Sequence, residues 1–233
     1  MSELLGARLS GFTLPSFLKA DMGLRPYSRV VWSEGMHLAQ HHFQAQSRYL
    51  EASAAFAAAR LSFKPYGFLR LSMDEEAIQE GVVSITEAKG VMPDGLTFDF
   101  PHGDSLPPPV EANTGGGASG DPSTLFLAIP AFVASRSNCD EEDDGAGGAG
   151  SKNRYRAERV TVPDQNTGED KRDLVLASKN FRIVYASELS EELVALPMAR
   201  IRTGPGGHFE YIRDFIPPGL DVGATPRLPG VLG

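Results

Sequence analysis

Pro65 separates two stretches of chain whose apolar residues follow different periods. Before it, apolar residues spaced 7, 4, 3 and 4 apart form one stripe of a helix: Phe43, Leu50, Ala54, Ala57 and Leu61. Proline disfavours the helical conformation in the residue before it, so the helix ends by Lys64. After it, apolar residues alternate with polar ones, as a half-buried strand requires: Leu69, Leu71 and Met73. The chain is therefore predicted to form one long helix near residues 38–61, followed by a sheet.

The stripe headed by Phe43 has two possible roles. An amphipathic helix usually buries its apolar face against its own domain. We expect Phe43 to fill the core between helix and sheet, with a cost of about 3 to 5 kcal/mol for Phe43→Ala. If that substitution leaves stability unchanged, the stripe faces a partner or solvent instead.

The rest of the chain predicts antiparallel strands. Period-two or continuous apolar runs predict strands over residues 81–89, 96–100, 125–133, 155–162, 171–185, 196–203 and 208–213. Short turns join three pairs of them, at residues 93–95, 164–168 and 204–207. No second helical pattern separates the strands, which argues against a parallel α/β sheet. The predicted fold class is mainly β.

Composition changes mark the expected boundaries of the domain. Residues 1–26 show no sustained period and form a leader, typical of a disordered terminus. Residues 27–216 make up the folded domain, with Gly-rich or acidic loops at 111–123 and 135–153 that we expect to be mobile. Residues 217–233 hold four Pro and four Gly and resemble a connector.

Charge and cysteine content exclude several classes of function. The chain carries 22 Lys and Arg against 30 Asp and Glu, a net charge of −8, which disfavours binding to nucleic acid or anionic lipid. Its single cysteine excludes an internal disulfide and a Cys-rich metal site. No apolar run approaches the roughly 20 residues of a membrane span, and the leader lacks a signal peptide's apolar segment. We expect a cytoplasmic protein without membrane insertion.

Two motifs point weakly to chemistry. Residues 145–150 fit G-x-G-x-x-G, but five acids at 140–144 precede them and would repel a phosphate, so a flexible loop is the better interpretation. His37 and His41 are four apart, yet residue 38 is Leu38 rather than the Glu of H-E-x-x-H, and no third ligand is evident. We expect no metal and no cofactor; a metalloprotein that uses His37 and His41 is the third hypothesis, which metal analysis of the purified chain would test.

The only tryptophan, Trp32, lies between the leader and the helix. One interpretation is a core anchor whose indole N–H bonds a carbonyl. The other is an interface anchor, since tryptophan is enriched among the residues that dominate binding energy. The sequence leaves both open.

Several blocks of sequence resemble a known family. Residues 30–38, 40–44 and 48–50 are similar to the opening signature of the TssK family, also called ImpJ or VasE, which are baseplate subunits of bacterial type VI secretion. Further blocks follow in order to about residue 228: 65–68, 90–95, 106–109, 164–168, 196–201 and 215–218. Ala39-Gln40 departs from the family's usual Arg-Pro or Ser-Pro, which leaves the helix start open. Family members are about twice as long.

The resemblance implies a fold and partners. It implies an antiparallel β-sandwich called the shoulder, with one long N-terminal helix, similar to the shoulder domains of phage receptor-binding proteins. In the family three chains form a trimer, and the shoulder faces the wedge proteins TssF and TssG. It also implies that the connector at 217–233 leads to a helical neck and then to a C-terminal head, two parts that are expected beyond this chain. In the family the head contacts TssL and TssM.

We therefore expect a structural adaptor rather than an enzyme, with no catalytic residues. The alternative is a β-sandwich hydrolase or carbohydrate-binding module, which a carboxylate-lined cleft and exposed aromatic rings would favour. The candidate partner-binding residues surround the start of the helix: Val30, Val31, Trp32, Glu34, His42 and Phe43.

Overall fold

The computed structural model describes residues 28–61, 64–113, 122–140, 151–204 and 206–221. The leader at 1–26, most of the expected loop at 111–123, residues 141–150 and the end of the chain from 222 lie outside these described residues. The predictions of a disordered leader and of mobile loops therefore stay predictions.

The predicted long helix is present as α1, Gln40–Leu61. It begins two residues later than predicted, at Gln40. The backbone N–H of Ala39, the residue just before the helix, donates a hydrogen bond to Nδ1 of His42 at 3.1 Å, and this bond marks the end of the preceding loop. Many alanines give the segment a high helix propensity. The chain leaves the helix before Pro65, as proline requires.

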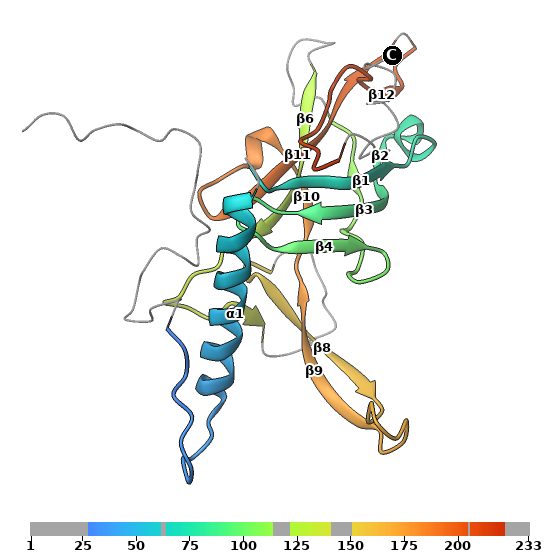
Figure 1. Ribbon diagram of the computed structural model, residues 1–233. Coiled ribbons are helices and arrows are strands. Elements are labelled where there is room, and N and C mark those ends of the chain that lie inside the picture. Colours follow the sequence, from blue (N-terminus) through green and yellow to red (C-terminus); the bar gives the residue numbers. More distant parts are fainter. Residues whose placement is uncertain (1–27, 62–63, 114–121, 141–150, 205, 222–233) are drawn as a thin grey trace, which may run out of the picture.

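Two antiparallel sheets make up the body of the domain. The first has the order β1-β3-β4, with bounds Gly67–Met73, Ile85–Val91 and Thr97–Phe100. The second has the order β10-β6-β11-β12, with bounds Arg182–Tyr185, Ser123–Pro130, Leu193–Thr203 and Phe209–Tyr211. The first sheet crosses in front of β6, β10 and β11 in Figure 1, so the two form a sandwich and the predicted fold class is confirmed.

Smaller elements complete the fold. The short strands β2 (Val82–Val83) and β5 (Val110–Glu111) pair with each other. The 3-10 helices η2 (Ala77–Glu80) and η3 (Ala186–Glu188) flank the sheets. A third sheet has the order β7-β8-β9, with bounds Cys139–Asp140, Tyr155–Val162 and Arg172–Lys179. Its β8–β9 hairpin extends away from the sandwich in the same direction as the start of α1 (Figure 1). The β7–β8 pair is parallel and the other named strand pairs are antiparallel.

The core of the sandwich contains a cluster of four phenylalanine rings. The Phe98 ring stacks on that of Phe100 with centroids 5.5 Å apart and meets Phe68 and Phe181 edge to face. All four side chains are buried. Phe68, Phe98 and Phe100 belong to the first sheet, whereas Phe181 directly precedes β10 of the second sheet. The cluster therefore joins the two layers.

The described part of the expected connector is tied to β1. The Phe68 N–H donates to the carbonyl of Pro218, and the Leu220 N–H donates to the carbonyl of Phe68, both at 2.8 Å. Gly219 pairs with Phe68 in a parallel bridge. Residues 217–220 therefore extend the first sheet at the edge of β1.

Gly90 lies where two backbones come close, and its replacement by alanine tests this packing. A Cβ at Gly90 would lie 2.2 Å from the carbonyl oxygen of Gly67 and 2.8 Å from the Phe98 ring. We expect Gly90→Ala to lower the free energy of unfolding by about 2 to 3 kcal/mol, measured by urea denaturation, because backbone must shift to relieve the contact. Gly103→Ala is the control, since the nearest atom there is 3.4 Å away. Equal stability of the two variants would contradict the packing.

A buried ion pair connects the turn before β4 to the start of β8. Nη2 of Arg154 lies 2.6 Å from Oδ2 of Asp94, and both side chains are only 3% exposed. Nη1 of Arg154 donates to the carbonyl of Pro130 at 2.8 Å. The Asp94 Oδ1 accepts from the N–H of Leu96, so the carboxylate also holds its own turn.

In the described part of the chain, no helix combines the length and apolar character that crossing a membrane would require.

Candidate partner-binding surface

The helix α1 packs on its own domain at Ala52, Ala55 and Arg48. Ala52 is completely buried, and a side chain at Gly95 would come within 3.4 Å of the Ala55 Cβ. The guanidinium carbon of Arg48 lies 4.0 Å from the centre of the Phe132 ring. The start of α1 extends beyond these contacts, past the end of the sandwich (Figure 1).

The apolar stripe of α1 faces away from the domain. Successive helix residues turn by about 100°, which places Phe43, Leu50 and Ala54 on the side opposite Ala52. Phe43 is 56% exposed and Leu50 is 57% exposed. The prediction of a single stripe is confirmed in its geometry, but the prediction that Phe43 fills the core is wrong, because the alanine side of the helix occupies that contact instead.

Trp32 packs against the start of α1 rather than in the core. Its ring centroid lies 6.3 Å from those of both His42 and Phe43, in tilted arrangements. The side chain remains 49% exposed, so the interpretation of Trp32 as a core anchor is wrong. The rings of Trp32, His42 and Phe43 thus pack together at the start of α1 and leave aromatic surface open to solvent.

The other predicted site residues belong to the same segment. Val31 and Glu34 are exposed, and Val30 is partly buried. Two exposed apolar residues that the prediction left out, Leu38 and Leu50, enlarge the surface. The helical stripe already contained Leu50, so the sequence pattern could have assigned it to the site. We call the set of Val31, Trp32, Leu38, Phe43 and Leu50 the N-terminal apolar surface.

The two histidines considered as metal ligands do not share a helix face. His37 precedes the first residue of α1, whereas His41 lies within its first turn. Within the described ranges, no group of three or more His, Cys, Asp and Glu side chains could hold a metal ion. The spacing of four between His37 and His41 therefore does not place their imidazoles on one face of a helix.

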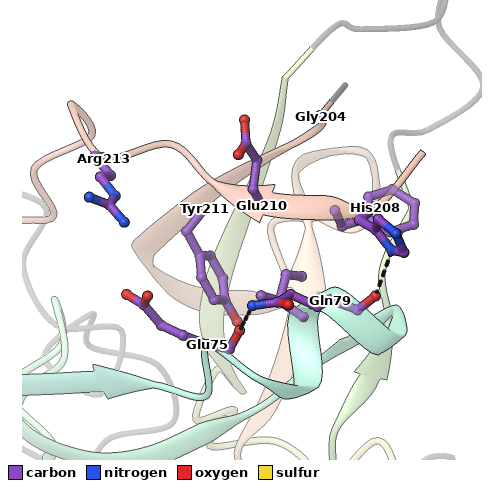
Figure 2. A pocket seen from close by; sticks show the side chains of 9 residues that line it. Glu75, Gln79, Gly204, His208, Glu210, Tyr211 and Arg213 are labelled. Atoms are coloured by element: carbon purple, nitrogen blue, oxygen red, sulfur yellow. Dashed lines mark hydrogen bonds between the residues drawn. The ribbon is translucent and has the colours of Figure 1, made fainter. Parts of the chain in front are cut away.

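A polar cavity of about 290 Å³ lies elsewhere, between η2 and β12. Figure 2 shows Glu75 and Gln79 on one side and His208, Glu210 and Arg213 on the other. Nε of Arg202 donates to the Glu210 carboxylate at 2.7 Å, and Tyr211 is buried. Two carboxylates, those of Glu75 and Glu210, line the cavity, and the Glu210 carboxylate is the one paired with Arg202.

The fold and the site together define a β-sandwich domain that carries an outward-facing apolar helix. Residues 42–233 match the model of a protein family described as bacterial type VI secretion, VC_A0110, EvfL, ImpJ, VasE. The chain is 32% identical over 203 residues to the type VI secretion system baseplate component TssK1 of Pseudomonas aeruginosa, an alignment that covers 86% of this chain and 44% of that protein. The chain therefore belongs to the TssK family, and the resemblance noted in the sequence is confirmed.

Solved structures share the fold. A crystal structure of TssK superposes with a TM-score of 0.75 at 29% identity, covering 87% of this chain and 44% of the other. A chain in a cryo-electron microscopy structure of a TssK-TssF-TssG baseplate subcomplex has the same fold, with a TM-score of 0.76 at 23% identity, covering 86% of this chain and 65% of that one. The chain spans 44% of the length of its curated relative, TssK1 of Pseudomonas aeruginosa.

Proposed function

We propose that this chain is the shoulder part of a structural adaptor in the type VI secretion baseplate. The observation that carries the proposal is the N-terminal apolar surface, which is exposed although its residues are large and apolar. Apolar patches of this kind mark protein–protein contacts. The match to a baseplate component supports the same role.

The proposed partners are the wedge proteins TssF and TssG. Support comes from the matched subcomplex, in which a relative assembles with proteins of those names. We further propose that the full-length protein is a homotrimer and reaches the membrane complex proteins TssL and TssM through a C-terminal head outside this chain. The adaptor acts in the cytoplasm and catalyses no reaction.

The proposed domain division follows the same assignment. Residues 1–26 are a leader, 27–216 the shoulder, and 217–233 the connector to a helical neck. The pairing of residues 217–220 with β1 means that such a neck would start from a point fastened to the first sheet.

Replacing Trp32 should weaken partner binding without unfolding the domain. We expect Trp32→Ala to raise the Kd for the purified TssF–TssG pair of the same bacterium about tenfold, because buried tryptophans commonly dominate interfaces. Stability should change little, since half of the ring is already in water. Biolayer interferometry measures the Kd, and thermal unfolding checks the fold.

The matched control is Leu106→Ala, at an exposed apolar residue outside α1 and the segment before it. Its affinity should equal that of wild type. Absence of wild-type binding to the pair would reject the proposed partners, and unchanged affinity of Trp32→Ala would reject the proposed surface.

A further inference from the structure

The β8–β9 hairpin is a two-stranded arm with an exposed apolar strand. Each of its strands is eight residues long, and the hairpin extends away from the sandwich (Figure 1). Three consecutive large apolar side chains of β9 are exposed by 45%, 60% and 46%: Leu174, Val175 and Leu176. An isolated pair of strands is only marginally stable in water, and further strands usually support it. We call residues 155–179 the β8–β9 arm.

Both long edges of the β8–β9 arm are open within the described ranges. There, β9 pairs with β8 and with no other strand. The strand β7 pairs with β8 at Tyr155 and Arg156 alone, which leaves the rest of β8 without a second described neighbour. Open strand edges are templates for pairing with another chain. A single added strand would cover one edge, whereas copies of the arm arranged head to tail cover both, because β9 of each copy meets β8 of the next.

One face of the β8–β9 arm collects its large aliphatic side chains. The register sets the two strands side by side, and residues two apart along a strand share a face. The four aliphatic residues on this face are Val160, Val162, Leu174 and Leu176. The charged residues beside them on the same face are bound within the arm: Glu158 accepts a hydrogen bond from Ser178, and Arg172 donates one to Asp170. The face can therefore be covered without leaving these two charges unpaired.

The charge of the β8–β9 arm favours a second copy as the occupant. The arm is neutral although the whole chain has a net charge of −8. It holds five basic and five acidic residues: Arg156, Arg159, Lys171, Arg172 and Lys179 against Glu158, Asp164, Glu169, Asp170 and Asp173. A site for an oppositely charged partner would carry an excess of one sign. A neutral arm instead lets identical copies approach each other, although the chain as a whole is acidic.

We propose that copies of this chain join through their β8–β9 arms, with β9 of each copy paired to β8 of the next. The contact is head to tail, so it closes into a ring, and three arms together supply six strands. The four aliphatic side chains of each arm face the axis of the ring. This inference rests on the homotrimer of the proposed function and deepens it, because it names the element that joins the copies.

Sedimentation of this chain over a range of concentrations measures the association, and wild type should form a trimer. Leu174→Lys places a charge among the axial side chains of every copy. It should raise the concentration needed for half-assembly by about tenfold or more, because an unpaired charge would be buried. Gln165→Lys adds the same charge at the exposed turn between β8 and β9 and should assemble like wild type. Thermal unfolding checks that Leu174→Lys stays folded, which its 45% exposure leads us to expect.

Hydrogen exchange of wild type, compared below and above the concentration of half-assembly, locates the contact independently of any variant. The expected result is slower exchange of backbone amides in both β8 and β9 on assembly. Slower exchange in α1 with no change in the arm would overturn the proposal. So would a wild type that remains monomeric or stops at a dimer, or equal assembly of Leu174→Lys and Gln165→Lys.

Binding of the purified TssF–TssG pair separates this inference from the proposed partners. If wild type assembles through the arm but does not bind the pair, the proposed partners are rejected and the arm contact stands. If wild type binds the pair but remains monomeric at every concentration, the arm contact is rejected and the adaptor role stands.

Discussion

Phe98→Ala is expected to lower the free energy of unfolding by about 3 to 5 kcal/mol, the usual cost of removing a buried aromatic side chain. Phe98 is only 2% exposed. Its ring lies within 5.5 to 5.8 Å of three others, those of Phe68, Phe100 and Phe181. The cavity would open between the two layers of the sandwich, where neither sheet can close it alone. Urea denaturation followed by circular dichroism measures the change.

The matched variant is Phe43→Ala, which removes the same atoms from α1. Because Phe43 is 56% exposed and outside the sandwich core, we expect its loss to cost less than about 1 kcal/mol. Similar losses in the two variants would mean that α1 is part of the core and that the N-terminal apolar surface is covered. A small loss for Phe98→Ala would contradict the aromatic cluster.

Arg154→Leu is expected to cost about 3 to 5 kcal/mol, because it leaves the Asp94 carboxylate buried without its partner. Both side chains of the pair are 3% exposed, and water reaches neither freely. The variant also loses the hydrogen bond to the Pro130 carbonyl, which lies at the end of β6. At about 2 to 4 °C per kcal/mol for a domain of this size, the Tm should fall by about 10 °C.

Two controls separate burial from charge in this prediction. Arg70→Leu removes a comparable ion pair with Glu87, but the Arg70 side chain is 64% exposed, so the expected loss is below about 1 kcal/mol. The double variant Asp94→Leu, Arg154→Leu removes both buried charges and should recover part of the stability lost in Arg154→Leu. If Arg154→Leu and Arg70→Leu unfold at the same urea concentration, the buried pair contributes nothing.

Local periodicity was sufficient to place most elements. The strand β8 has the bounds that alternation predicted, and α1 differs only at its start. The two-residue strands β5 and β7 were not predicted, since two residues carry no period to detect. The run predicted at 125–133 ends as a strand at Pro130, three residues earlier than predicted.

The sequence by itself determined that Phe43, Leu50 and Ala54 lie on one side of a helix, since that angle depends only on spacing along the chain. It also placed Asp94 in a tight turn and Trp32 just before the helix. These are local properties, and each follows from neighbours within a few residues.

Only the tertiary structure decided which side of α1 meets the domain. The turn at Gly95 and the ring of Phe132 approach the alanine side of the helix, and both are far from α1 in the chain. The same holds for Asp94, whose burial depends on Arg154, 60 residues away. Burial is a property of contacts between distant segments, whereas a periodic pattern reports only directions about one axis. The apolar stripe could therefore be recognised from spacing, but its exposure could not.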